Sequence, residues 1–148
     1  MEKTMQEQME REIRESMDKL YPKDPDHLYS KMQIEFYSCS YEKKSVTLRF
    51  PIQRWELNHM STVHGGIIAV AMDTTCGTAV RSVTGKTMIP TINLNINYIS
   101  RGLAGDAMLL TAWADRAGRR ICNISAQCKS EKTGKLIATA AANFMIAE

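Results

Sequence analysis

The chain lacks the features that would place it in a membrane or outside the cell. None of its apolar runs approaches the roughly 20 residues that span a bilayer. The first residues, MEKTMQEQMEREIRES, contain no hydrophobic segment of the signal-peptide type. We therefore expect a cytoplasmic protein without a membrane partner.

Cysteine and histidine are scarce and are not spaced for metal binding. The four cysteines form no CxxC pair, and none has a histidine at zinc spacing. His59 and His64 are five residues apart and lack the carboxylate of a metalloprotease motif. We expect neither a metal site nor a bound cofactor, and we expect reduced, partly buried thiols at Cys39, Cys76, Cys122 and Cys128.

A strong excess of one charge is also missing. The net charge of the 148 residues is only +3, and the bases are scattered, which argues against a nucleic-acid partner. One small cluster, Arg116, Arg119 and Arg120 around Gly118, suits a small anionic ligand. The composition, 44% hydrophobic and 24% charged, is that of a soluble globular protein with one core.

The most informative segment spans residues 64–83 and reads HGGIIAVAMDTTCGTAVRSV. It predicts a helix that is apolar on nearly every side and therefore buried. Its one carboxylate, Asp73, is expensive to bury unless it is paired. Asp73 is either hydrogen-bonded to nearby donors or is a general base or nucleophile. His64, Gly65 and Gly66 favour function, because glycines let another group approach free backbone N–H donors.

The apolar pattern of the remaining chain predicts one further helix and a series of strands. A stripe from Met5 to Leu20 predicts a surface helix that packs on its own domain or subunit and ends before two prolines. Alternation from Lys31 to residue 52, interrupted by a polar turn, predicts a β-hairpin. Four strands follow the buried helix, at 92–98, 107–116, 120–130 and 135–146.

Strands and helices do not alternate along the chain, which disfavours a doubly wound parallel sheet. An apolar helix needs cover on most sides, and one strongly curved antiparallel sheet can provide it. We therefore expect an α+β fold in which such a sheet, its last four strands in a meander, wraps around a long central helix. An additional helix lies at the N-terminus.

A set of motifs carries a resemblance to a known family. An asparagine precedes an HGG triplet by six residues, an aspartate follows its histidine by nine, and a strand ending in tyrosine and two glycine turns come later. These are Asn58, His64-Gly65-Gly66, Asp73, 91–98, Gly118-Arg119-Arg120 and 133–138. The pattern resembles the hotdog-fold acyl-CoA thioesterases of the phenylacetate-pathway (PaaI-like) branch. It covers residues 29–148 as one domain and leaves 1–28 as an amphipathic helix and linker.

The resemblance implies a catalytic site on the buried helix. It implies that Asp73 acts as general base on water or as nucleophile on the thioester. The Gly65 N–H at the helix start would polarise the thioester carbonyl. Asn58 would orient the attacking water or the carbonyl, and Thr91 would assist the water near the carboxylate. His64 would hold the loop and support the carbonyl-binding region.

The resemblance also implies that coenzyme A binds as part of the substrate, at the end of a strand and at the basic turn. The implied contacts are Gly66, Asn93, Ser100, Arg101, Arg116, Gly118, Arg119 and Arg120. Arginine suits this role because its fork holds phosphate oxygens through two hydrogen bonds. The sequence does not define the acyl group, although walls formed by Met60, Val63, Met72 and Met88 would favour broad tolerance.

Helix geometry adds a constraint that is independent of the resemblance. Asp73 lies eight residues beyond Gly65, which is about 12 Å along the axis at about 1.5 Å per residue. One carboxylate cannot reach a carbonyl that is held at the start of its own helix. The two halves of the site must then come from different chains, as the two-fold dimer of the resembled family provides. We expect a homodimer, and more specifically a dimer of dimers.

Two other functions stay open beside hydrolysis of an acyl-CoA thioester. A hydratase or dehydratase on the same fold would need a paired acid and histidine that this arrangement does not match. A non-catalytic module that binds or senses acyl-CoA would lack the catalytic acid, whereas Asp73 is present. Thioester hydrolysis is therefore the leading hypothesis.

Overall fold

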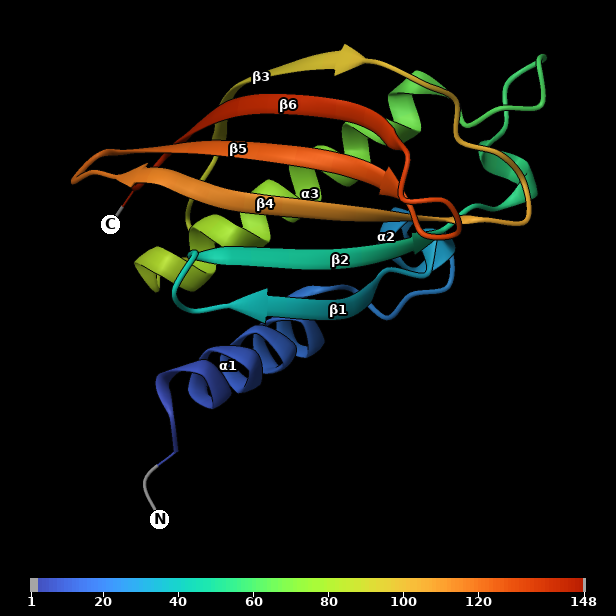
Figure 1. Ribbon diagram of the computed structural model, residues 1–148. Coiled ribbons are helices and arrows are strands. Elements are labelled where there is room, and N and C mark those ends of the chain that lie inside the picture. The colour runs from blue at the N-terminus through green and yellow to red at the C-terminus, as the bar shows by residue number, and fades with distance from the viewer. Residues whose placement is uncertain (1–2, 148) are drawn as a thin grey trace.

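One long helix, α3 (Gly65–Thr84), lies against the inner face of a curved antiparallel sheet in the computed structural model, which describes residues 3–147 (Figure 1). The six strands are arranged in the order β1-β2-β4-β5-β6-β3. Their bounds are β1 (Glu35–Ser40), β2 (Ser45–Pro51), β3 (Thr91–Tyr98), β4 (Ala107–Ala117), β5 (Ile121–Ser130) and β6 (Leu136–Met145). The predicted α+β architecture is confirmed.

The sequence of α3 explains its place in the core. Half of its 20 residues are buried, and the helix is apolar on several sides, as predicted. Gly85 ends the helix in the left-handed conformation, with φ of 69°, which glycine adopts without strain. Inward side chains of the sheet complete the core, among them Val46, Leu48, Phe50, Leu110, Ile124 and Phe144. No helix within residues 3–147 is long and apolar enough to cross a membrane.

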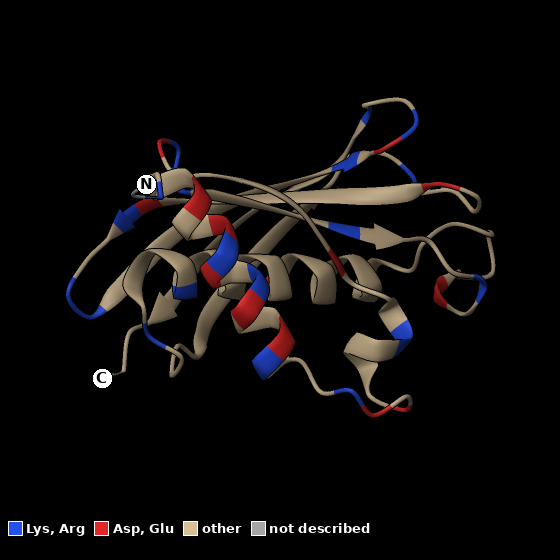
Figure 2. Ribbon diagram, turned by 90° about the horizontal axis from the view of Figure 1, so that it is seen from below, with Lys and Arg blue, Asp and Glu red and all other residues tan. Residues whose placement is uncertain are grey.

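The N-terminal helix α1 (Met5–Leu20) packs on its own domain, as its apolar stripe predicts. A capping box between Thr4 and Glu7 fixes its first turn. Met9 and Ile13 are buried, and α1 contacts both β1 and α3. Its charged residues lie on the outward side, where Figure 2 shows alternating acidic and basic positions along the helix.

The segment before β1 differs from the prediction. Alternation predicted a strand beginning at Lys31, but Leu28–Met32 form a short helix, α2, and the strand begins only at Glu35. The His27 side chain caps α2 by accepting a hydrogen bond from Tyr29 N at 3.1 Å. Gln33 then ends α2 in the left-handed conformation. Local capping therefore overrides the alternating pattern.

The predicted four-strand meander is wrong for β3. The meander consists of β4, β5 and β6, whereas β3 pairs with β6 on the far side of the sheet from β2. Apolar alternation identifies a strand but carries no information about its neighbours, which are set by long-range packing over α3. As a result, β3 is an edge strand beside α3.

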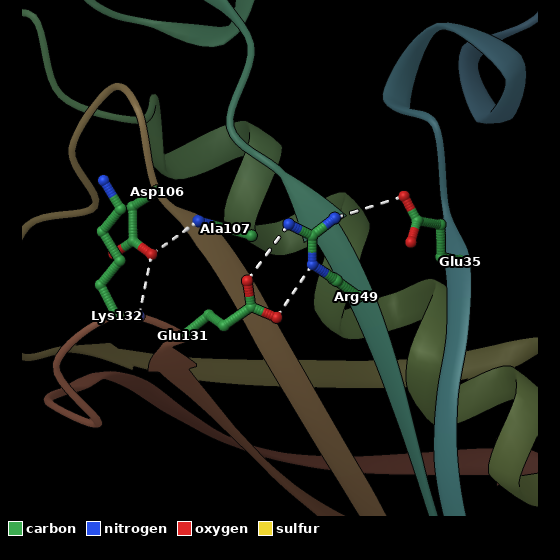
Figure 3. Close-up of polar contacts among 6 residues, drawn as sticks. All are labelled: Glu35, Arg49, Asp106, Ala107, Glu131 and Lys132. Atoms are coloured by element: carbon green, nitrogen blue, oxygen red, sulfur yellow. Dashed lines mark hydrogen bonds and ion pairs between the residues drawn. The ribbon is translucent and has the colours of Figure 1, made fainter.

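A charged network connects the first two strands to the turn between β5 and β6 (Figure 3). Arg49 on β2 donates to both carboxylate oxygens of Glu131, at 2.9 and 3.1 Å, and to Glu35 at 3.3 Å. A two-pronged guanidinium–carboxylate contact fixes the relative orientation of its partners. The network therefore ties the start of β1 and the end of β2 to the turn before β6.

Asp106 anchors the same turn from the start of β4 (Figure 3). Burial alone would raise the pKa of Asp106, but hydrogen bonds from the Ser130 hydroxyl and from the backbone N–H groups of Ala107 and Lys132 together lower it. The carboxylate thus stays ionised and accepts these donors. They set the position of the turn that precedes β6.

Candidate active site

Asp73 faces the edge strand β3 from the middle of α3. The Thr91 hydroxyl donates a hydrogen bond to Asp73 Oδ1 at 2.7 Å. Asp73 Oδ2 makes no hydrogen bond to any residue within 3–147, and Asp73 borders a cavity of about 340 Å³. One carboxylate oxygen is therefore held in place while the other can accept a proton or attack a bound molecule.

A shift in strand register brings Thr91 to Asp73. Strict alternation would put Thr91 on the same face as Asn93, pointing away from α3. The pairing of β3 with β6 shifts between Thr91 and Asn93. Such irregularities re-aim a side chain, and here the Thr91 hydroxyl reaches the helix. The Thr91 hydroxyl thus lies beside the Asp73 carboxylate, near which the resemblance places a residue that assists the water.

At the start of α3, the peptide between Gly65 and Gly66 is held from both sides. Gly66 N–H donates to His64 Nδ1 at 2.8 Å, and the Gly65 carbonyl accepts from the Tyr98 hydroxyl at 2.7 Å. Gly65 N–H makes no hydrogen bond to the described residues and lies at the positive end of the helix. This arrangement can stabilise a developing oxyanion.

Tyr98 is a positioning residue that sequence reasoning noted only as the end of a strand. Its hydroxyl reaches a residue 33 positions away in the chain. Its ring also lies so close that a Cβ on Gly65 would meet it at 3.3 to 3.4 Å. No local pattern signals such a contact, because it depends on the way β3 passes the start of α3.

In the loop before α3, the Asn58 side chain uses its oxygen in hydrogen bonds, while its amide nitrogen has no partner among the described residues. The Asn58 side-chain oxygen accepts from Met60 N at 2.9 Å and from both the N–H and the hydroxyl of Thr62 at 3.2 Å. These contacts shape the loop and occupy the oxygen. The amide nitrogen has no partner within residues 3–147, so any orienting role falls to its N–H groups.

Glu56 supports this loop and was not predicted. It is 1% exposed, and its Oε1 accepts from Gln53 N at 2.7 Å. Burial raises the pKa of the Glu56 carboxyl, and the hydrogen bond from Gln53 only partly opposes this. Its backbone carbonyl accepts from His64 N at 2.9 Å. A buried acid thus fixes the loop that leads to the start of α3.

Asp73 and Gly65 contact opposite ends of β3, at Thr91 and Tyr98. On β6, Phe144 pairs with Thr91 and Ala138 pairs with Tyr98. Six residues of strand correspond to about 20 Å at about 3.3 Å per residue. Within one chain, Asp73 and the Gly65 N–H are therefore held beside opposite ends of β3.

The three predicted arginines line a second cavity at the turn between β4 and β5. Its volume is about 460 Å³, and its walls are Arg116, Gly118, Arg119, Arg120, Ile121 and Asn123. A Cβ on Gly118 would lie 2.9 Å from the Ile121 carbonyl oxygen, so this tight turn requires glycine. None of the three arginines forms an ion pair within residues 3–147. The cavity is therefore suited to an anion such as phosphate.

The other predicted coenzyme A contacts are divided between the two ends of the sheet. Asn93 accepts from the Asn143 side chain at 3.0 Å, and Asn143 accepts from Asn123 in the wall of the arginine cavity. The Ser100 hydroxyl, next to Arg101, donates to the carbonyl of Leu136 at the start of β6. One chain brings Asn93 to the arginine cavity but keeps Ser100 and Arg101 at the Gly65 end.

Cys76 lies one helical turn after Asp73 and is fully buried. Burial above all, followed by the charge of Asp73 and the nearby Cys122, raises the pKa of the Cys76 thiol to about 12. A thiol with so high a pKa is protonated and unreactive at neutral pH. Cys76 is a packing residue rather than a nucleophile.

A curved antiparallel sheet packed around one long central helix is the hotdog fold. Residues 60–137 match the family model of the thioesterase superfamily. The chain belongs to this family.

Three known proteins illustrate the similarity. The chain is 26% identical over 87 residues to acyl-coenzyme A thioesterase 13 of Mus musculus, and this match covers 59% of the chain and 62% of the mouse protein. The E. coli PaaI protein from the phenylacetic acid degradation operon has a TM-score of 0.80 and 16% identity, with 95% of this chain and 96% of that chain covered. Smu.793 from Streptococcus mutans, bound to acetyl CoA, has a TM-score of 0.68 and 22% identity, with 77% and 88% covered. The two solved structures share the fold.

Two glycines of α3 give opposite expectations for substitution. A Cβ on Gly77 would lie 3.7 Å from each of its three nearest atoms, which is ordinary contact. Gly77→Ala should therefore raise the free energy of unfolding by about 0.5–1 kcal/mol, because alanine favours a helix interior. Gly65→Ala should give no such gain, because its methyl group presses on the Tyr98 ring. Urea unfolding measures both, and a destabilised Gly77→Ala would contradict the packing described.

Proposed function

We propose that the protein hydrolyses an acyl-CoA thioester to a free carboxylic acid and coenzyme A. The observation that carries this proposal is the Asp73 carboxylate, held by Thr91 through one oxygen and free at the other. The mouse relative named as an acyl-coenzyme A thioesterase and the Streptococcus mutans structure bound to acetyl CoA support the choice of substrate. In this proposal no cofactor is needed beyond the coenzyme A of the substrate.

The proposed reaction uses the two halves of the site on opposite sides of one carbonyl group. As general base, Asp73 takes a proton from water while the water oxygen attacks the thioester carbon. The oxyanion that forms accepts a hydrogen bond from Gly65 N–H. The C–S bond then breaks, and the departing thiolate takes the proton from Asp73. As nucleophile, Asp73 would instead attack the thioester carbon and form an anhydride as the C–S bond breaks and coenzyme A leaves as the thiolate. Water would then hydrolyse the anhydride, which frees Asp73 and the acid and releases the proton that the thiolate takes up.

We further propose that each site is shared between two subunits. The Asp73 half and the Gly65 half lie about 12 Å apart along α3 and at opposite ends of β3. The outer edge of β3 has no strand beside it within the described residues. Two such edges related by a two-fold axis run antiparallel, which places the Asp73 half of one subunit beside the Gly65 half of the other. The same symmetry brings Ser100 and Arg101 toward the partner's arginine cavity, and two such dimers would form the tetramer.

Loss of the Asp73 carboxylate tests the catalytic assignment. Asp73→Asn should lower kcat by about two to four orders of magnitude, the range for losing a general base. Thr91→Val, which removes one hydroxyl, should lower kcat by about tenfold to a hundredfold because it only orients the carboxylate. Release of free thiol from acyl-CoA measures turnover, and Asp18→Asn on the exposed side of α1 is the matched control. A folded Asp73→Asn with near wild-type turnover would refute the assignment.

The arginine cavity should affect binding rather than chemistry. The double substitution Arg119→Ala with Arg120→Ala should raise KM for acyl-CoA while kcat changes little, because a contact to the nucleotide is equally strong in ground and transition states. The variant should hydrolyse a pantetheine thioester, which lacks the nucleotide, as well as the wild type does. An equal loss on both substrates would show instead that these arginines support the fold.

Mixed dimers test the shared site directly. Homodimers of Asp73→Asn and of Gly65→Leu, which blocks the start of α3, should each be nearly inactive. In a mixed dimer, one of the two sites receives Asp73 and Gly65 intact from different subunits. Random pairing after co-refolding should restore about a quarter of wild-type activity, since half of the dimers are mixed and each has one good site. No recovery, with heterodimers shown by mass spectrometry, would place the whole site in one chain.

A further inference from the structure

The cavity beside Asp73 continues along α3 to a cationic side chain. Asp73, Gly77 and Arg81 line it from one face of the helix, four residues apart, and residues 87–91 line it from the other side. Because Gly77 has no side chain, the helix places nothing between the carboxylate and the guanidinium. If Asp73 attacks or activates water here, the acyl group lies in this cavity of about 340 Å³.

The guanidinium of Arg81 lies one helical turn closer to Asp73 than its own Cα does. Arg81 Nη2 donates to the Thr78 hydroxyl at 3.2 Å, and Nη1 lies 3.7 Å from the position that a Cβ on Gly77 would take. Helical side chains lean toward the N-terminus of the helix. The charge is thus at the level of Gly77, about 6 Å along the axis from the level of Asp73.

Arg81 has too few acceptors in its own chain. Its Nε is buried and without a hydrogen-bond partner, and Arg81 forms no ion pair within residues 3–147. Glu12 borders a neighbouring cavity with Arg81, yet its carboxylate accepts from Gln8 instead. A half-buried cation without an acid partner favours an anionic ligand, because the ligand replaces lost hydration.

The segment before β1 closes this end of the cavity. Tyr29 lines the cavity and its ring lies 4.9 Å from the ring of Tyr21. The Thr78 hydroxyl donates to the Thr74 carbonyl at 2.9 Å, so the Tyr21 hydroxyl is the donor in its own 2.9 Å contact with Thr78. Burial raises the pKa of Tyr21, so that no phenolate competes for Arg81.

We propose that Arg81 binds a carboxylate at the far end of the acyl group, and that the substrates are CoA thioesters of short dicarboxylic acids. This inference rests on the proposed hydrolysis at Asp73. The separation of about 6 Å along the helix suits an acyl group about as long as glutaryl. The far end is cationic and lined by hydroxyl groups, which disfavours a long hydrocarbon chain.

The test compares glutaryl-CoA with pentanoyl-CoA, which has the same chain length but no terminal carboxylate. Wild-type protein should prefer glutaryl-CoA in kcat/KM by about 10- to 100-fold, the effect of a charge-assisted hydrogen bond. Arg81→Met, which keeps the length but removes the charge, should abolish most of that preference, and Arg81→Lys should retain part of it. Arg11→Met, an exposed position on α1, is the matched control and should keep the preference.

Binding separates this proposal from the hydrolysis proposal. Calorimetry on the Asp73→Asn background, with and without Arg81→Met, gives the ratio of Kd values for the two ligands without turnover. If the wild type hydrolyses neither compound, the hydrolysis proposal fails, and the Kd ratio still decides the role of Arg81. The role is overturned if wild-type protein does not prefer the glutaryl ligand. It is equally overturned if folded Arg81→Met, or Arg81→Gln should the methionine variant not fold, has the wild-type ratio.

Discussion

The enclosure of one helix by one curved sheet is the constraint on which the rest of the structure depends. The sheet packs along its concave face against α3, and half of the helix residues are buried. A carboxylate on such a helix is tolerable only where the cover is incomplete, since an unpaired buried charge is costly. Asp73 occupies that place, facing the edge strand β3, where the Thr91 hydroxyl compensates one oxygen and a cavity adjoins the carboxylate. The fold thus determines where on the helix the chemistry can lie.

The same helix orders three groups by their distance from its positive end. Gly65 N–H lies at the N-terminus, where free donors and the helix dipole favour a negative charge. Asp73 lies near the middle, and Arg81 lies in the last turn, where the dipole favours a cation. Because a helix is rigid, these spacings cannot adjust to a substrate. A thioester that needs both Gly65 and Asp73 must therefore lie between two helices, whereas an acyl group that extends from Asp73 to Arg81 can follow one.

Local patterns in the sequence predict the bounds of the helices and strands well, but they do not predict which strands pair with one another. The helix predicted at 64–83 and the strands after it agree with the structure to within a residue or two at each end. The pairing of β3 with β6 and the register shift that turns Thr91 inward depend on contacts between distant segments. Likewise, the resemblance indicates Asn58 but not which of its amide atoms is free, and no spacing reveals that Tyr98 binds the Gly65 carbonyl. Periodicity reports burial along one element, whereas site geometry depends on several.

The cavity beside Asp73 shows the same limit for the substrate that the sequence can predict. The sequence predicted that methionine-rich walls would give broad acyl tolerance. Of the four residues named there, only Met88 borders the cavity beside Asp73. Met72 is fully buried in the core. Tyr21, from the segment outside the family resemblance, and Tyr29, at the first residue of the resemblance, lie around Arg81. A cavity that begins at a carboxylate and ends at a cation imposes a polarity on its ligand that flexible apolar walls alone would not. In the proposed function, acyl specificity therefore depends on residues outside the motif that carries the family resemblance.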